Sequence, residues 1–321
     1  MTEPRRKRVN LNWQSAQTIQ IKLDTTVPKR NWLLFLLMGM GFWTWATPSQ
    51  GQALLPYNPN LNTEQIEQQG LSLTEDVIQL VRFQQYDLAL ARAKLAVQLA
   101  PQRFQTWFIL GTLYLQQDKV DLGIQSLLKA QSMAPEEAGI KFTLGNAYFQ
   151  KGDYTTAIAA LQAGLKIKPE TTAALFDLGN SYLKLGQYGD AILSYEKAVS
   201  IDKNFWPAIN NMGLVNFEQG DLEGALKKWD QAISIDKEQA EPQLARAVAL
   251  YSQGKQEVGL KAGETALKLD SRYADLKFLQ ENLWGDRLLQ ETKTFLSNPQ
   301  IKTFLATLPP SSENIDKKAA E

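Results

Sequence analysis

Residues 107–135, which read WFILGTLYLQQDKVDLGIQSLLKAQSMAP, decide the fold of this chain. The segment LGTLY at 110–114 returns as LGNAY at 144–148 and as LGNSY at 178–182, each time 34 residues further on. Met212-Gly213 continues the series, although Asn216 replaces the tyrosine. A fixed period of this kind is typical of a repeat protein, in which each unit packs only on its neighbours.

Two further series of small residues keep the same period. Each unit is predicted to be two amphipathic helices joined by a turn, such as 150–153 or 219–221, where a glycine adopts the left-handed conformation that ends a helix. Glycine or alanine at a helix crossing lets two backbones approach closely, and a bulky residue would force them apart. The series are Ala89, Gly123, Ala157, Ala191, Ala225 and Gly259, and Ala96, Ala130, Gly164, Ala198, Ala232 and Ala266.

On these residues the chain resembles the tetratricopeptide-repeat (TPR) family. The family consensus is similar to the pattern Trp107, Leu110-Gly111, Tyr114, Gly123, Leu127, Ala130 and Pro135. The resemblance implies an all-α fold, a right-handed α-solenoid of helical hairpins with a C-terminal helical cap. We expect a linker and the start of the first helix at 54–69, six units at 70–103, 104–137, 138–171, 172–205, 206–239 and 240–273, capping helices at 274–308 and a flexible tail at 309–321.

Residues 1–53 form a basic leader followed by an apolar segment. The apolar run WLLFLLMGMGFWTWA at 32–46 is shorter than the roughly 20 residues that span a bilayer, which favours a cleavable signal peptide with its cleavage site near Ala53. The long region ahead of it and the tryptophans at its end favour a retained membrane anchor instead. A buried amphipathic segment is the third interpretation. The first two predict export across a membrane, into the periplasm, the thylakoid lumen or an equivalent compartment, either soluble or anchored by 32–46.

The inventory of side chains excludes most familiar active sites. The 321 residues include no cysteine and no histidine, so zinc sites built on thiolate or imidazole, thiol nucleophiles and Ser-His relays cannot form. The sequence also lacks the glycine-rich phosphate and dinucleotide motifs and the calcium loop. We therefore predict no catalytic residue, no metal ligand and no cofactor, and a protein that is not an enzyme.

The charge pattern argues against a nucleic-acid partner. The chain has 34 basic and 34 acidic residues, but seven of the basic and only two of the acidic ones precede residue 31. The remainder is therefore mildly acidic, which disfavours electrostatic capture of phosphate backbones.

The TPR resemblance implies that the first helix of each hairpin lines a concave surface that binds other proteins. Phenylalanines there would offer shallow apolar pockets, and asparagine amides would pair with the donors and acceptors of an extended peptide. The alternatives are core packing for the phenylalanines and a hydrogen bond to a neighbouring helix for the asparagines. The candidate groove consists of Phe108, Phe142, Phe176 and Asn210 and, four positions further along each helix, Thr112, Asn146, Asn180 and Leu214.

We expect a scaffold that binds partner segments in this groove. Chaperone-type members of the family hold a C-terminal aspartate with lysines and an arginine, but Phe108 and Phe142 occupy the places of clamp lysines here, so no carboxylate-clamp binding is expected. The array with its apolar leader loosely resembles cyanobacterial and plastid repeat proteins that help assemble photosystem complexes, which implies a role in assembling a membrane complex. The alternative is a soluble exported carrier or envelope scaffold without an assembly role.

Overall fold

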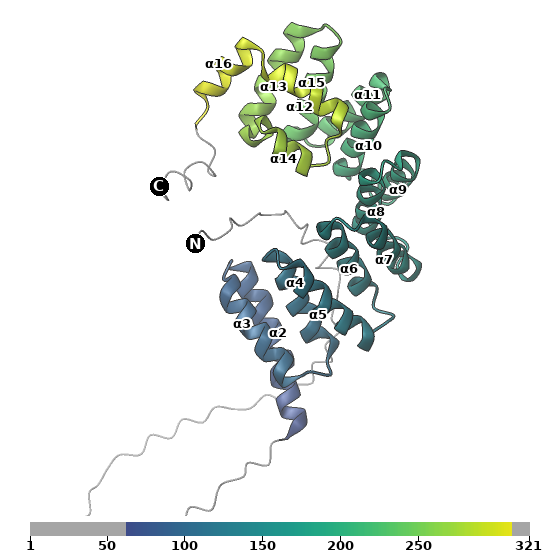
Figure 1. The fold of residues 1–321 in the computed structure, drawn as a ribbon, viewed down its shortest axis with the longest axis vertical. Helices are drawn as coiled ribbons and strands as arrows, with labels where there is room; N and C mark the ends of the chain where they lie inside the picture. Colours follow the sequence, from purple (N-terminus) through teal and green to yellow (C-terminus); the bar gives the residue numbers. More distant parts are fainter. Residues whose placement is uncertain (1–61, 310–321) are drawn as a thin grey trace, which may run out of the picture.

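The computed structural model describes residues 62–309, and within this range it contains α-helices, one 3-10 helix and no strand (Figure 1). The leader 1–53, with its apolar segment, and residues 54–61 and 310–321 lie outside the described residues. The helices are α2 (Thr63–Arg82), α3 (Tyr86–Leu99), α4 (Phe104–Gln116), α5 (Val120–Met133), α6 (Ala138–Lys151), α7 (Tyr154–Ile167), α8 (Thr172–Lys184), α9 (Tyr188–Ile201), α10 (Trp206–Glu218), α11 (Leu222–Ile235), α12 (Ala240–Ser252), α13 (Gln256–Leu269), η1 (Ser271–Ala274), α14 (Leu276–Glu281), α15 (Asp286–Leu296) and α16 (Pro299–Thr307).

The helices from α2 to α13 form six consecutive hairpins that stack along a curve. Each hairpin packs most closely within itself and then against the next hairpin in the chain. Figure 1 shows α7, α9 and α11 on the outer side of the curve and α6, α8 and α10 on its inner side. The predicted fold class is confirmed: the chain is an all-α solenoid of helical hairpins with a C-terminal helical cap.

The turn inside each hairpin places one residue in the left-handed region of backbone space. The predicted glycine turns are confirmed, since Gly152 has φ of 85° and Gly220 has φ of 86°. Gly186 and Gly254 adopt the same conformation one period later in each case. In the first two hairpins the equivalent residues are Gln84 (φ 58°) and Asp118 (φ 59°), and of these two side chains aspartate adopts this conformation more readily than glutamine.

The small residues predicted at the helix crossings are buried in every hairpin, from Ala89 to Gly259. A second crossing lies at the glycine of each Leu-Gly pair and at Gly213, which follows Met212; each of these glycines faces one side chain of the second helix. That side chain is Leu127 against Gly111 and Leu161 against Gly145, but it is Tyr195 against Gly179 and Trp229 against Gly213. From the second hairpin to the fifth, this part of the interior therefore changes from aliphatic to aromatic.

The C-terminal helices cover the last hairpins. Trp284, Leu288, Phe295 and Ile301 are buried in one apolar cluster with side chains of α10 to α13. The Glu218 carboxylate accepts hydrogen bonds from the backbone N–H groups of residues 287 and 288, at 3.1 and 2.9 Å, and so satisfies the first turn of α15. Burial of this apolar surface closes the end of the solenoid that would otherwise face solvent.

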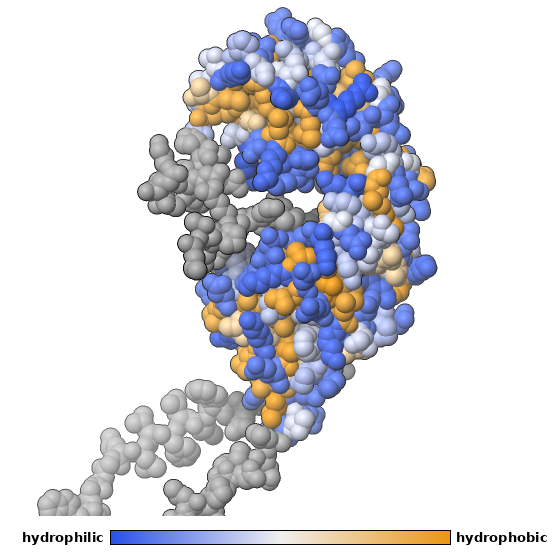
Figure 2. Space-filling model, viewed as in Figure 1, coloured by the Kyte–Doolittle hydropathy of each residue, from blue (hydrophilic) through white to orange (hydrophobic). Residues whose placement is uncertain are grey.

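The surface is mixed, with apolar side chains exposed on the first hairpins. Figure 2 shows orange patches on the lobe formed by α2 to α5 and blue, hydrophilic residues around the opening between this lobe and the cap. Phe83 is 73% exposed, and Leu88 and Leu122 are also exposed. Within residues 62–309 no helix is both long and apolar enough to cross a bilayer.

Candidate functional site

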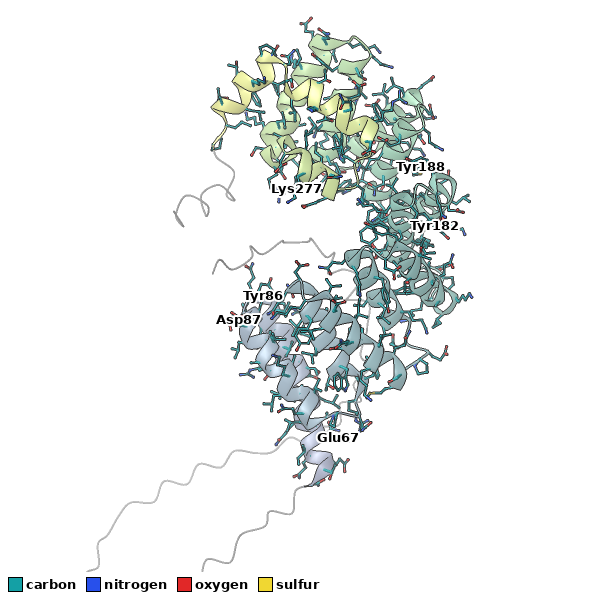
Figure 3. The ribbon with its side chains drawn as sticks, viewed as in Figure 1. Glu67, Tyr86, Asp87, Tyr182, Tyr188 and Lys277 are labelled. Atoms are coloured by element: carbon teal, nitrogen blue, oxygen red, sulfur yellow. The ribbon has the colours of Figure 1, made fainter. Side chains whose placement is uncertain are left out.

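The first helices of successive hairpins touch one another along the inner side of the curve, so side chains on them can join into a row. α6, α8, α10 and α12 carry this row in the middle and last hairpins. Figure 3 labels Tyr182 of α8 and Tyr188 of α9 at the middle of the curve, Lys277 on the cap, and Tyr86 and Asp87 of α3 on the opposite lobe.

The predicted phenylalanine set proves to be mainly packing. Phe108 is half-buried beside the apolar cluster of α5 and α6. The Phe142 ring covers Gly164 and is 6% exposed. Phe176 is half-buried, with its ring centroid 5.9 Å from Tyr195 and 5.4 Å from Phe205. Of these three, Phe108 and Phe176 keep surface that a partner can reach.

Three residues of the predicted groove are corrected by their burial. Phe142, Asn210 and Leu214 have between 1% and 6% of their surface exposed, which leaves no area for a partner to contact. For Phe142 and Leu214 the reason is apolar packing between hairpins. Asn210 is buried as part of a hydrogen-bonded network, although its Oδ1 atom has no partner among residues 62–309.

The other three members of the second set are half-buried. The Thr112 hydroxyl donates to the backbone carbonyl of Phe108, at 2.9 Å, so its polar group is used within its own helix. The Asn146 amide interacts with the carboxylate of Asp177 on the next first helix and lowers its pKa. Asn180 accepts at its Oδ1 atom from Asn211 Nδ2, at 2.9 Å. The asparagines therefore bond to neighbouring helices, as the alternative interpretation expected, while part of each side chain stays exposed.

These contacts belong to a longer row of polar side chains, which we call the amide row: Asn146, Asp177, Asn180, Asn210, Asn211 and Glu241. Asn210 Nδ2 donates to Asn211 Oδ1, at 3.1 Å, and the Asn210 side chain also interacts with Glu241 and lowers the pKa of that carboxylate. The row thus runs from α6 across α8 and α10 to α12. Hydrogen bonds between side chains of successive repeats fix their rotamers, so the row is a preorganised polar surface.

Tyr195 supports the row from inside its hairpin. The side chain is fully buried against Gly179, and its hydroxyl donates to Asn180 Oδ1 at 2.8 Å. Burial raises the pKa of the Tyr195 phenol far above its usual range, and the charge of Asp177 acts in the same direction. The phenol therefore remains a protonated hydrogen-bond donor at any physiological pH.

The two carboxylates of the row have unusual proton affinities. Burial raises the pKa of Asp177 to about 7, opposed by the hydrogen bond from Asn146. Burial likewise raises the pKa of Glu241 to about 7, opposed by hydrogen bonds from Asn210, Trp284 and Tyr273. Trp284 Nε1 lies 3.2 Å from Glu241 Oε1, so this carboxylate ties the cap to the last hairpin. Asp177 has only one such donor.

Sequence reasoning missed Asp177, Asn211, Tyr195 and Glu241. A signal for the first two exists, because Asn146 and Asp177 are 31 residues apart and so are Asn180 and Asn211. This spacing is three residues shorter than the 34-residue repeat. The second residue of each pair therefore lies on the next first helix, about one turn before the position equivalent to the first residue. Among residues 62–309 no group of histidine, cysteine, aspartate and glutamate side chains is arranged to hold a metal ion.

Comparison with known families identifies the repeats. Residues 145–186, 179–220 and 213–254 match the model of the TPR repeat. Residues 57–138 match the model of ChAPs, the Chs5p-Arf1p-binding proteins. A search among curated proteins finds no match. The chain therefore carries tetratricopeptide repeats, as its sequence pattern predicted.

The chain is similar to several solved structures. PilW, a widely conserved type IV pilus biogenesis factor, is 18% identical, with a TM-score of 0.59 over 74% of this chain and 99% of its own. MamA is 24% identical, with a TM-score of 0.49 over 54% of this chain and 93% of its own. YrrB, a TPR protein with an unusual peptide-binding site, is 19% identical, with a TM-score of 0.48 over 60% of this chain and 97% of its own. At these identities the likeness is one of fold alone.

Proposed function

We propose that this chain is a scaffold for protein–protein interaction that binds an extended segment of a partner along the amide row. The partner runs across α4, α6, α8 and α10 on the inner side of the solenoid. Its backbone pairs with the asparagine amides, and apolar side chains rest on the exposed parts of Phe108 and Phe176. The function is binding, without a chemical step.

One observation carries this proposal: the two half-buried asparagines keep complementary polar atoms unused. The Asn146 amide interacts with the Asp177 carboxylate, and no residue among 62–309 donates to its Oδ1 atom. Asn180 accepts twice at Oδ1, and its Nδ2 atom donates to no residue in the same range. An open acceptor and an open donor on successive helices are what the N–H and C=O groups of an extended backbone require.

The row is also rigid enough to bind at low entropic cost. Asn180 is held by Tyr195 and Asn211, and Asn146 is held by Asp177, so neither amide must be ordered when a partner arrives. Preorganised groups contribute more to affinity than mobile ones, because immobilising a side chain on binding costs roughly 0.5–1.5 kcal/mol.

The proposal is tested by the double variant Asn146→Ala/Asn180→Ala. Random peptides of about twelve residues, long enough at about 3.3 Å per residue to cross several helices, are selected by display on the full chain. Their affinity for the variant should fall by about tenfold or more, because two hydrogen bonds are lost. The matched control is Asn204→Ala, in the exposed link between α9 and α10. Equal affinity for the double variant and the wild type would discard the groove, as would a failure to select any peptide.

The cellular setting of this scaffold is a proposal that rests on the sequence of the leader. A basic region ahead of the apolar segment 32–46 supports delivery of the repeats across a membrane, and in this proposal they hold subunits of a membrane complex there during assembly. Amino-terminal sequencing of the mature protein separates the two forms of the leader. A start at Leu54 would contradict a retained anchor, and an intact start at Met1 or Thr2 would contradict a soluble exported form.

A further inference from the structure

The two phenylalanines that a partner can reach on the inner side lie two hairpins apart. The position of Phe108 recurs every 34 residues on the first helix of each hairpin. Phe108 and Phe176 are half-buried, whereas the other members of this series between residues 62 and 309 have at most 6% of their surface exposed. Those buried members are Thr74, Phe142, Asn210 and Leu244. The series therefore offers an aromatic surface on α4 and on α8, but not on α6 between them.

Phe142 is withdrawn from the inner side because its ring lies against Gly164 of α7. A Cβ atom at residue 164 would lie 2.6 Å from Phe142 Cδ1 and closer still to Cε1. Carbon atoms that are not bonded to each other approach no closer than about 3.5 Å without repulsion. The ring thus fills a space that exists only because residue 164 has no side chain.

The other two phenylalanines meet an alanine at the equivalent position. Gly164 is the single glycine in a series that is otherwise alanine from residue 96 to residue 266. Ala130 is fully buried in the apolar cluster against which Phe108 packs, and Ala198 is fully buried in the cluster against which Phe176 packs. The alanine methyl group occupies the space that the Phe142 ring fills in the hairpin α6–α7, so each of these rings keeps part of its surface on the inner side.

We propose that Gly164 determines which partner segments the groove selects, namely extended segments with two apolar side chains about six residues apart and no apolar requirement between them. The inference rests on the proposed function and names the chemistry of its partner. First helices of successive hairpins contact one another and so lie about 10 Å apart. The path across the helices from α4 to α8 is then about 20 Å, which corresponds to about six residues of extended chain.

The surface between the two anchors is suited to the backbone of the segment. On α6 the half-buried residue that remains on the inner side is Asn146, whose amide belongs to the amide row. A bulky apolar side chain placed there would desolvate this amide and gain no apolar contact with Phe142. Small or polar residues are therefore expected in the middle of the segment.

The test uses the full chain in mild detergent and the same displayed library of random peptides. Selection is repeated on Gly164→Ala, which should force the Phe142 ring out, and on Ala130→Gly, which should let the Phe108 ring in. Ala130 is the better reciprocal site, because Leu127 and Leu161 fill equivalent places in these two hairpins. The controls are exchanges of the same type at exposed helix positions, Gly189→Ala in α9 and Ala159→Gly in α7. Circular dichroism of each variant shows whether the array is folded.

Peptides selected on the wild type should be enriched in apolar residues at two positions about six apart. Those selected on Gly164→Ala should gain a third apolar position midway, and the double variant Gly164→Ala/Phe142→Ala should lose it again. Ala130→Gly should lose one of the two original preferences, with about a fivefold to tenfold drop in affinity for the wild-type peptides, because an apolar contact is lost.

Three results would overturn the inference and leave the groove intact, provided that binding still depends on Asn146 and Asn180. These are wild-type peptides without the two apolar positions, a Gly164→Ala selection without the third position, and a third position that survives removal of the Phe142 ring. If Gly164→Ala does not fold, the Ala130→Gly variant decides, and wild-type affinity for that variant would overturn the inference. A library that yields no peptide would overturn the groove and the inference together.

Discussion

The hairpins α4–α5 and α8–α9 are built on one plan and differ in what fills it. Both place a glycine of the first helix against a side chain of the second, but the partner is Leu127 in the earlier hairpin and Tyr195 in the later one. The leucine side chain packs against the glycine but has no polar group with which to form a hydrogen bond. The tyrosine fills the same space, and its hydroxyl also donates a hydrogen bond to Asn180 on the inner side of the solenoid.

This difference teaches how a repeat acquires a site without changing its fold. In α8–α9 one buried residue serves both the packing of the hairpin and the orientation of an amide that a partner can reach. In α4–α5 the equivalent of Asn180 is Thr112, which bonds only to its own helix. A change in the core of α8–α9 should therefore affect binding, whereas the same change in α4–α5 should affect stability alone.

The largest effect is expected when an alanine replaces the crossing glycine. A Cβ atom at Gly179 would collide with the Tyr195 ring, and one at Gly111 would lie 2.8 Å from Leu127 Cγ. Each variant should lower the free energy of unfolding by about 1–3 kcal/mol in urea denaturation. Only Gly179→Ala should also weaken binding of a selected peptide, because it displaces the hydroxyl that holds Asn180.

A matched control for this pair is Gly189→Ala, on the same hairpin. Gly189 is exposed in α9, and an added Cβ would meet nothing within 4 Å. Alanine there should raise stability by about 0.5–1 kcal/mol, because glycine is the poorer helix former. If Gly179→Ala bound peptide as well as Gly189→Ala does, this would contradict the claim that packing in the hairpin core orients the binding site.

The next effect is on the pH dependence of binding. The pKa of Asp177 is raised to about 7, so the carboxylate is mostly neutral at about pH 6 and mostly ionised at about pH 8. Affinity for a selected peptide that places a lysine or arginine side chain against Asp177 should therefore rise by about tenfold over this range, in proportion to the ionised fraction of Asp177. Isothermal titration calorimetry checks this, and Asp177→Asn should show no such rise.

The raised pKa of Asp177 also predicts that stability changes with pH in the direction opposite to binding. A carboxylate whose pKa is raised in the folded state, here from 3.8 to about 7, loses its stabilising contribution as the pH rises. The advantage of Asp177→Asn over the wild type should thus grow between about pH 4 and pH 7 and remain constant above that. An advantage that shrinks with rising pH would show that Asp177 is not desolvated.

A smaller effect is expected from removal of the phenol oxygen. Tyr195→Phe keeps the ring against Gly179 and deletes the hydrogen bond to Asn180, which should cost about 1 kcal/mol in the free energy of unfolding. The control is Tyr182→Phe, whose hydroxyl bonds to the exposed side chain of Gln162 and should matter by less than half of that. Equal losses for the two variants would mean that the buried hydroxyl has no special role.

How much of this could be predicted from the sequence differs between fold and site. The 34-residue series of small residues predicted the hairpins, and Gly152 and Gly220 predicted their turns, because both depend on local backbone requirements. Asn146 and Asn180 were recognised as polar residues on the inner side. Asp177 was not connected with them, because a contact between successive helices lies 31 residues away and leaves no local pattern.

The same limit explains the errors. Phe142 and Leu214 occupy groove positions in the repeat register, yet each packs against a neighbouring unit: Phe142 packs with Ala174 and Leu178 of α8, and Leu214 joins the cluster under the cap. Burial depends on the sizes of side chains in the adjacent helix, and a single-unit pattern does not contain that information.

The smallest expected effect concerns the turn of the first hairpin. Gln84 holds the left-handed conformation that glycine supplies in the later hairpins. Gln84→Gly should raise the free energy of unfolding by no more than about 1 kcal/mol, because relief of strain is partly offset by the greater freedom of glycine in the unfolded chain. Thermal denaturation of the variant measures this, and a lower melting temperature would contradict it.

The most direct measurement is a photo-crosslink from the inner side of the solenoid. The chain contains no cysteine, so a single cysteine can be labelled uniquely with benzophenone maleimide. Thr143→Cys puts the label on α6 at the position equivalent to Asp177, and Leu193→Cys puts it on the exposed surface of α9, where the leucine is 56% exposed. A selected peptide should crosslink to the label at 143 and not to the label at 193, and the reverse result would contradict a binding site on the amide row.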